Sequence, residues 1–124
     1  MGKFTNIVAT AAVGVGRFVA PNGTADQVVE CTARADLASG VSCDGAAVGE
    51  PLPIAGVGEV VRVEVGAAGV AATDEYVTID EATGNGRAVG ASSTQIAHGR
   101  NINYQAASAG EFITIEVIAP LTVP

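Results

Sequence analysis

An eleven-residue pattern occurs twice in the sequence, 52 positions apart. Residues 55–65 read AGVGEVVRVEV and residues 107–117 read ASAGEFITIEV. In each copy a Gly-Glu pair precedes an alternation of β-branched and polar residues. A period of two is typical of a half-buried β-strand, and glycine supplies the backbone freedom that a tight turn requires. The pattern therefore predicts two equivalent strands, each entered through a turn. The turn residues are Gly58, Glu59, Gly110 and Glu111.

The same alternation extends beyond the repeat. It recurs at residues 76–80, which read YVTID. Turn residues separate the candidate strands every eight to twelve positions, and Asn85-Gly86 is typical of a β-hairpin turn. Short strands at this spacing predict an all-β fold, a small β-barrel or sandwich with Gly-rich turns. Weaker strand candidates lie at 11–19, 28–35, 87–91 and 97–104.

The length of 124 residues fits a single domain. We assign this β domain to residues 14–124. Residues 1–13 differ from it because they are largely apolar and contain no acidic residue. We interpret them as an extended N-terminal arm or as the first strand. The apolar run at 7–16 is weaker than a secretory signal, and no run approaches the ~18 residues of a membrane span.

The charge distribution excludes two classes of partner. The formal net charge is −7, and the six Lys and Arg residues are scattered singly. Nucleic-acid binding needs a clustered cationic footprint, and the negative field also opposes binding to anionic membranes. Aromatic residues make up 4% of the chain, which leaves little stacking surface for bases or sugars. We therefore expect protein partners, with no nucleic acid and no membrane.

Residues with catalytic or metal-binding chemistry are few and isolated. His98 is the single histidine, and its small neighbours are typical of a loop or an edge. Cys31 and Cys43 lack the spacing of a metal site. We interpret both as small buried hydrophobic residues. The alternative is a single disulfide between them. The acid pairs at 74–75 and 80–81 fit solvated strand ends. The prediction is a protein that is not an enzyme and binds no metal and no cofactor.

The second half of the chain carries a series of linked motifs. GEVVRVEVG at 58–66 is followed by YVTID at 76–80 and GRAVGA at 86–91, and then by Gly99-Arg100 and QAASAGEF at 105–112. These motifs resemble the small capsid decoration (cement) proteins of tailed bacteriophages. In that family a hairpin ending in Gly-Arg-Ala-Val precedes Gly-Arg-Ala-Leu-x-Ala-Ala-Ser-Ala-Gly-Glu and a final valine-rich strand. Residues 101–104 depart from the family's shorter link.

The resemblance implies a compact β domain, usually a homotrimer, on the outer surface of the capsid. Such a protein is made in the host cytoplasm and resides in the virion. It binds at junctions between copies of the major capsid protein and stabilises the expanded shell. An acidic exterior is compatible with this role, because it keeps free copies soluble and away from nucleic acid.

We place the contact with the capsid in the N-terminal segment. An apolar, β-capable arm can add a strand to the sheet edge of a neighbour, with main-chain hydrogen bonds giving affinity. The alternative is an ordinary first strand of the protein's own barrel. The candidate capsid-binding residues are Gly2, Lys3, Phe4, Thr5, Asn6, Ile7 and Val8.

Two other functions remain open from the residues alone. The first is a head-fibre base or an adhesive surface module, for which Tyr76 and Tyr104 are the aromatic candidates. The second is a trimeric enzyme with sites shared between subunits. It would require His98, Arg100 or Asp80 to converge across an interface.

Overall fold

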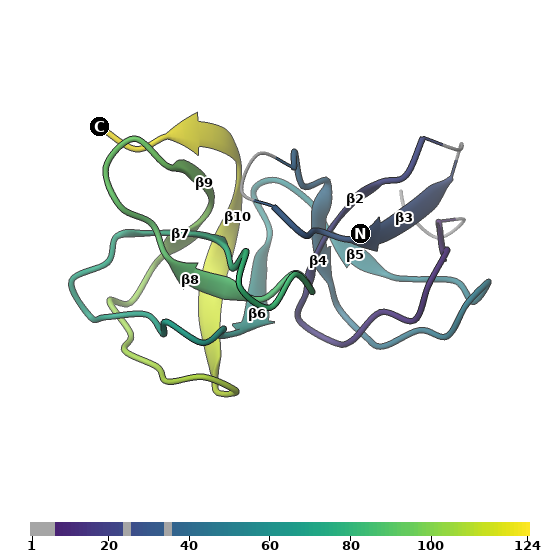
Figure 1. Ribbon diagram of the computed structural model, residues 1–124, viewed down its shortest axis with the longest axis horizontal. Helices are drawn as coiled ribbons and strands as arrows, with labels where there is room; N and C mark the ends of the chain where they lie inside the picture. The colour runs from purple at the N-terminus through teal and green to yellow at the C-terminus, as the bar shows by residue number, and fades with distance from the viewer. Residues whose placement is uncertain (1–6, 24–25, 34–35) are drawn as a thin grey trace.

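The computed structural model of the chain consists of β-strands and turns. It describes residues 7–23, 26–33 and 36–124, and in these ranges ten strands form two five-stranded sheets without a helix. Figure 1 shows the two sheets side by side, with the amino-terminal half of the chain in one and the carboxy-terminal half in the other. The predicted all-β fold with short strands is confirmed. In the described ranges there is also no helix long and apolar enough to cross a membrane.

The amino-terminal sheet contains β1 (Val8–Ala9), β2 (Phe18–Pro21), β3 (Gln27–Glu30), β4 (Gly40–Ser42) and β5 (Ile54–Ala55). Their order is β1-β3-β2-β4-β5. β1 runs parallel to β3, and the other neighbours are antiparallel. An antiparallel bridge joins Val8 to Pro51, in the segment that leads into β5. The sheet therefore curls back on itself.

The carboxy-terminal sheet contains β6 (Val60–Glu64), β7 (Tyr76–Ile79), β8 (Ala88–Gly90), β9 (Ile96–Asn101) and β10 (Phe112–Thr122). Their order is β6-β10-β9-β7-β8, with β9 in the centre. Val65, directly after β6, forms a parallel bridge with Ala88 at the start of β8. The bridge brings the two edge strands together and curls this sheet too.

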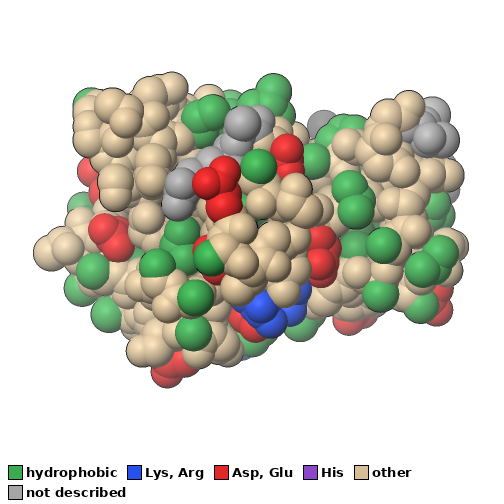
Figure 2. Space-filling model, in the orientation of Figure 1, with side chains coloured by type: hydrophobic (Ala, Val, Ile, Leu, Met, Phe, Trp, Pro, Cys, Tyr) green, Lys and Arg blue, Asp and Glu red, His purple; other side chains and the backbone are tan. Residues whose placement is uncertain are grey.

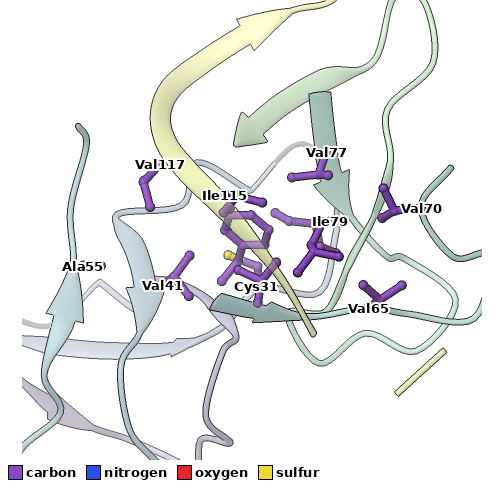
Figure 3. Packing of buried hydrophobic residues seen from close by; sticks show 13 residues of the cluster. Cys31, Val41, Ala55, Val65, Val70, Val77, Ile79, Ile115 and Val117 are labelled. Atoms are coloured by element: carbon purple, nitrogen blue, oxygen red, sulfur yellow. The ribbon is translucent and has the colours of Figure 1, made fainter. Parts of the chain in front are cut away.

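Two hydrophobic cores follow from the alternation of side chains on β2. Val19 is fully buried in a cluster within the amino-terminal sheet, together with Ile54. Its neighbour Phe18 is buried in the larger cluster, with Val41 from β4 and Ile115 from β10. Figure 3 shows how side chains from both sheets meet in this larger cluster. Because successive strand residues point to opposite faces, one strand serves both cores and ties the sheets together.

The sequence repeat forms a nearly symmetric antiparallel pair. Its two strands, β6 and β10, are hydrogen-bonded neighbours. At one end the Gly58 N–H donates to the Val117 carbonyl at 2.8 Å, and at the other end the Gly110 N–H donates to the Val65 carbonyl at 2.9 Å. The four residues occupy equivalent positions of the repeat. The prediction of two equivalent strands is confirmed.

Each turn of the repeat is closed by its own glutamate. Gly58 and Gly110 have φ angles of 89° and 85°, in the left-handed region that a type II turn requires. The carboxylate of Glu59 accepts a hydrogen bond from the backbone N–H three positions earlier at 2.8 Å, and that of Glu111 does the same at 2.6 Å. Residues 47–50 form a third turn of this kind, in which the Ala47 N–H donates to the Glu50 carboxylate at 2.7 Å. The sequence analysis did not predict this turn.

The expectation of a loop or edge position for His98 is wrong. His98 is 1% exposed and lies in β9, the central strand of its sheet. Gly99, next to His98, suggested a turn. In the structure it lies inside β9, where the missing side chain lets a neighbouring strand pack closely. A Cβ atom at this position would lie 2.5 Å from the Ile115 Cδ1 atom. Glycine inside a strand often marks such close approach.

Two further expectations about burial need correction. Asp80 is buried, and its carboxylate accepts hydrogen bonds from the Ala67 and Ala82 N–H groups and the Thr83 hydroxyl, which replace hydration. These hydrogen bonds order the loop between β7 and β8. The loop contains Asn85 and Gly86, and the hairpin connection is therefore longer than the predicted two-residue turn. Both cysteines are free thiols, so no disulfide forms. Cys31 is buried as expected, whereas Cys43 is exposed.

We predict that Gly58→Ala and Gly110→Ala each lower the free energy of unfolding by about 1–2 kcal/mol, since alanine is strained at positive φ. No atom lies within 4 Å of the Cβ that either substitution adds, so backbone strain alone should cause the loss. Gly45→Ala is the matched control, because Gly45 lacks a positive φ and its Cβ would make an ordinary 3.5 Å contact. Urea denaturation measures all three variants. Equal stability of wild type and both turn variants would refute the strained-turn account.

Candidate functional site

Four charged side chains form an ion network where the two sheets meet. The Arg17 guanidinium lies 3.3 Å from the Glu30 carboxylate of its own sheet and 3.1 Å from the Glu64 carboxylate of the other sheet. Arg87 completes the network, with its Nε 2.7 Å from the second oxygen of Glu64. Arg17 also donates to the Asn85 carbonyl at 3.0 Å. The network therefore links the sheets through side chains that are mostly shielded from solvent.

The electrostatics of this network favour the ionised form of Glu64. Burial by itself would raise the pKa of its carboxyl group. The hydrogen bond from Arg87 and the charge and hydrogen bond of Arg17 outweigh that effect and hold the pKa below its ordinary value of 4.5. Two cations face two anions, so the network leaves no net charge for a ligand. We assign it a structural role at the junction.

An apolar groove of about 360 Å³ lies next to the ion network. We call it the junction groove, because residues of both sheets and of the segment before β2 line it. Val15 is 46% exposed there, and the Arg62 guanidinium lies 5.3 Å from the centre of the Phe112 ring. The groove is the candidate contact surface of the domain. Its lining residues are Val15, Ser42, Cys43, Val61, Arg62 and Phe112.

Figure 2 shows one face of the molecule, on which apolar side chains are scattered over both lobes. Basic side chains form a single group on this face, near the middle of the molecule, with acidic side chains close to it. The small share of basic side chains on this face agrees with the charge balance of the sequence.

The predicted capsid-binding segment is described only in part. Residues 2–6 lie outside the described residues. Ile7 packs against the core of the amino-terminal sheet, and the Val8 N–H donates to the Asp26 carbonyl at 2.9 Å. Ile7 and Val8 therefore contact the folded domain, and capsid binding by residues 2–8 stays a prediction.

The residues proposed for a shared enzyme site have separate structural contacts within the chain. The ring centre of His98 lies 5.8 Å from that of Phe18. Arg100 pairs with Glu116 at 3.1 Å on the exposed surface of the sheet, and Asp80 orders a loop. Within the described ranges, no three His, Cys, Asp or Glu side chains gather as metal ligands would.

The two tyrosines considered for an adhesive surface differ in their exposure. Tyr76 is half-buried in β7. Tyr104 was expected in a strand, but β9 ends at Asn101 and Tyr104 lies in the following turn with φ of 49°. It is 63% exposed.

The fold has a counterpart among solved structures. The chain is similar to a protein described as "head fiber gp8.5 N base in bacteriophage phi29", with a TM-score of 0.69, 16% sequence identity and coverage of 93% of both chains. At this identity the likeness establishes a shared fold. No family model and no curated protein matches the sequence.

We predict that Glu64→Gln lowers the free energy of unfolding by about 2 kcal/mol at neutral pH, since it leaves two partly buried arginines poorly paired. The pKa of Glu64 is lower in the folded than in the unfolded state, so its stabilisation is complete above the ordinary pKa of 4.5 and is lost as pH falls through the folded value. The deficit of the variant should therefore shrink below pH 4.5. Denaturation series at several pH values measure it.

Glu116→Gln is the matched control, because it breaks the exposed pair with Arg100. An exposed pair of this kind contributes about 0–1 kcal/mol. If Glu64→Gln costs no more than Glu116→Gln at neutral pH, the ion network does not hold the sheets together.

Proposed function

We propose that the protein is a structural component of a tailed-phage virion and attaches to the outer surface of the capsid. The observation that carries this proposal is the fold shared, over 93% of both chains, with a bacteriophage head fiber base. The sequence motifs between Gly58 and Val117 support the same role independently, because they resemble phage decoration proteins. Both likenesses concern proteins of the phage head.

Two forms of attachment fit these likenesses. The structural neighbour favours a base that holds a head fibre, whereas the sequence motifs favour a cement protein at junctions between major capsid proteins. Both roles need a stable β domain that docks on an assembled shell, and neither needs catalysis. We propose that the domain is not an enzyme and that it assembles as a homotrimer, a form that lets neighbouring copies cover exposed apolar surface.

The proposal predicts saturable binding to assembled shells. Purified protein mixed with emptied, expanded capsids should sediment with them at a fixed ratio to the major capsid protein. A cement protein should also raise the temperature at which the shell disrupts, while a fibre base should bind and leave that temperature unchanged. Light scattering of the free protein measures the oligomeric state. Absence of binding to any phage shell, together with binding to cells or glycans, would overturn the proposal in favour of an adhesive module.

Deletion of residues 2–6 tests the N-terminal arm. The deletion ends before Val8, so β1 and its pairing with β3 remain. We expect the shortened protein to unfold like wild type and to occupy fewer capsid sites. Lys3→Gln in the full chain shows whether the positive charge of the segment matters. Wild-type occupancy of the shortened protein would show that the arm does not bind the capsid.

A further inference from the structure

The junction groove contains Arg62, a cation for which the described part of the chain supplies no anionic partner. Of the arginines that the structure describes, Arg17 and Arg87 pair with Glu64, and Arg100 pairs with Glu116. Among the described residues, no carboxylate lies within ion-pair distance of Arg62, which is exposed and lines the groove. The chain has 13 acidic and six basic residues, so an arginine that forms no ion pair is unexpected.

The fold holds this arginine in place. Arg62 lies on β6, and its guanidinium covers the Phe112 ring of β10 at 5.3 Å. A cation over an aromatic face is attracted by the ring and loses rotamer freedom. The planar fork of an arginine can then pair with a carboxylate through two parallel hydrogen bonds. The side chain is thus preorganised for an anionic group that arrives at the rim.

The surface around Arg62 is apolar. Val60 lies two positions earlier on the same face of β6 and is 59% exposed. Val15 and Val61 line the groove itself. Burial of a partner's apolar side chain here would supply binding free energy, and the charge pair would fix its orientation. The groove therefore fits one apolar side chain next to one carboxylate.

We propose that the junction groove binds an extended segment of the major capsid protein that presents an apolar side chain beside an Asp or Glu residue. The apolar side chain enters the groove between the two sheets, and the carboxylate pairs with Arg62. This inference rests on the proposed function, because it names the partner's chemistry for the same attachment. It assigns the contact to the folded domain, in addition to the contact proposed for residues 2–6.

Capsid binding by Arg62→Gln tests the proposal, with Arg100→Gln as the matched control on the same sheet. We expect Arg62→Gln to weaken binding to emptied, expanded capsids at least about tenfold and to reduce the salt dependence of binding, because a charge pair is lost. Arg100→Gln should bind like wild type. Thermal unfolding should show that both variants are folded. Wild-type affinity of folded Arg62→Gln overturns the inference.

Labelling of Cys43 provides a second measurement on the unchanged chain. Cys43 is exposed in the groove, whereas Cys31 is buried and its pKa is raised to about 12, first by burial and then by Asp36. A maleimide should therefore label Cys43 in the free protein. Bound capsids should slow this labelling at least about tenfold if the groove is covered. Unchanged labelling of capsid-bound protein overturns the inference.

The outcomes separate the two proposals. If wild type binds no phage shell, the proposed function fails. If wild type binds and neither Arg62→Gln nor Cys43 labelling responds, the function stands and the groove is wrong. If Arg62→Gln changes only the mass of the free protein in light scattering, the groove is a contact between copies of this chain, which also overturns the inference.

Discussion

Two adjacent residues, Arg17 and Phe18, join the two sheets of this protein. The Phe18 side chain fills the larger core, and its N–H donates to the Gly86 carbonyl of the other half of the chain at 2.8 Å. The Arg17 guanidinium reaches Glu64 beside that core. Apolar burial and a partly shielded charge pair thus act at one place. Because burying an unpaired charge is costly, the four-residue ion network disfavours arrangements of the sheets in which Arg17 loses Glu64.

The abundance of small residues has a physical reason in this arrangement. Among the described residues, the cores contain one phenylalanine, Phe18, and otherwise consist mainly of valine, isoleucine and alanine. Strands that curl into a compact half-barrel approach one another closely, and Gly99 and Gly40 lie where a Cβ atom would collide with a neighbouring strand. The composition therefore reflects tight packing between short strands. The many Gly, Ala and Val residues are therefore part of an ordered fold.

The charged side chains of the described residues fall into two groups. Most take part in contacts within the chain, whereas Arg62 is available to bind a partner. Most described ion pairs and carboxylate hydrogen bonds close turns or hold sheets, as Glu59, Glu111 and Asp80 do. Arg62 is the exception, since the fold supports it with an aromatic ring and an apolar groove. A surface of this kind combines apolar contact area with one cation.

The sequence alone determined the strands of the repeat, their turns and the all-β class, because alternation and positive φ are properties of a few neighbouring residues. It also predicted strands near β7, β8 and β9, with errors at the ends. Tertiary structure decided what depends on distant residues. The burial of His98 follows from the central place of β9, and the ion network follows from the meeting of Arg17 with Glu64, 47 positions later. The junction groove likewise exists only where two sheets meet, so no local pattern could reveal it.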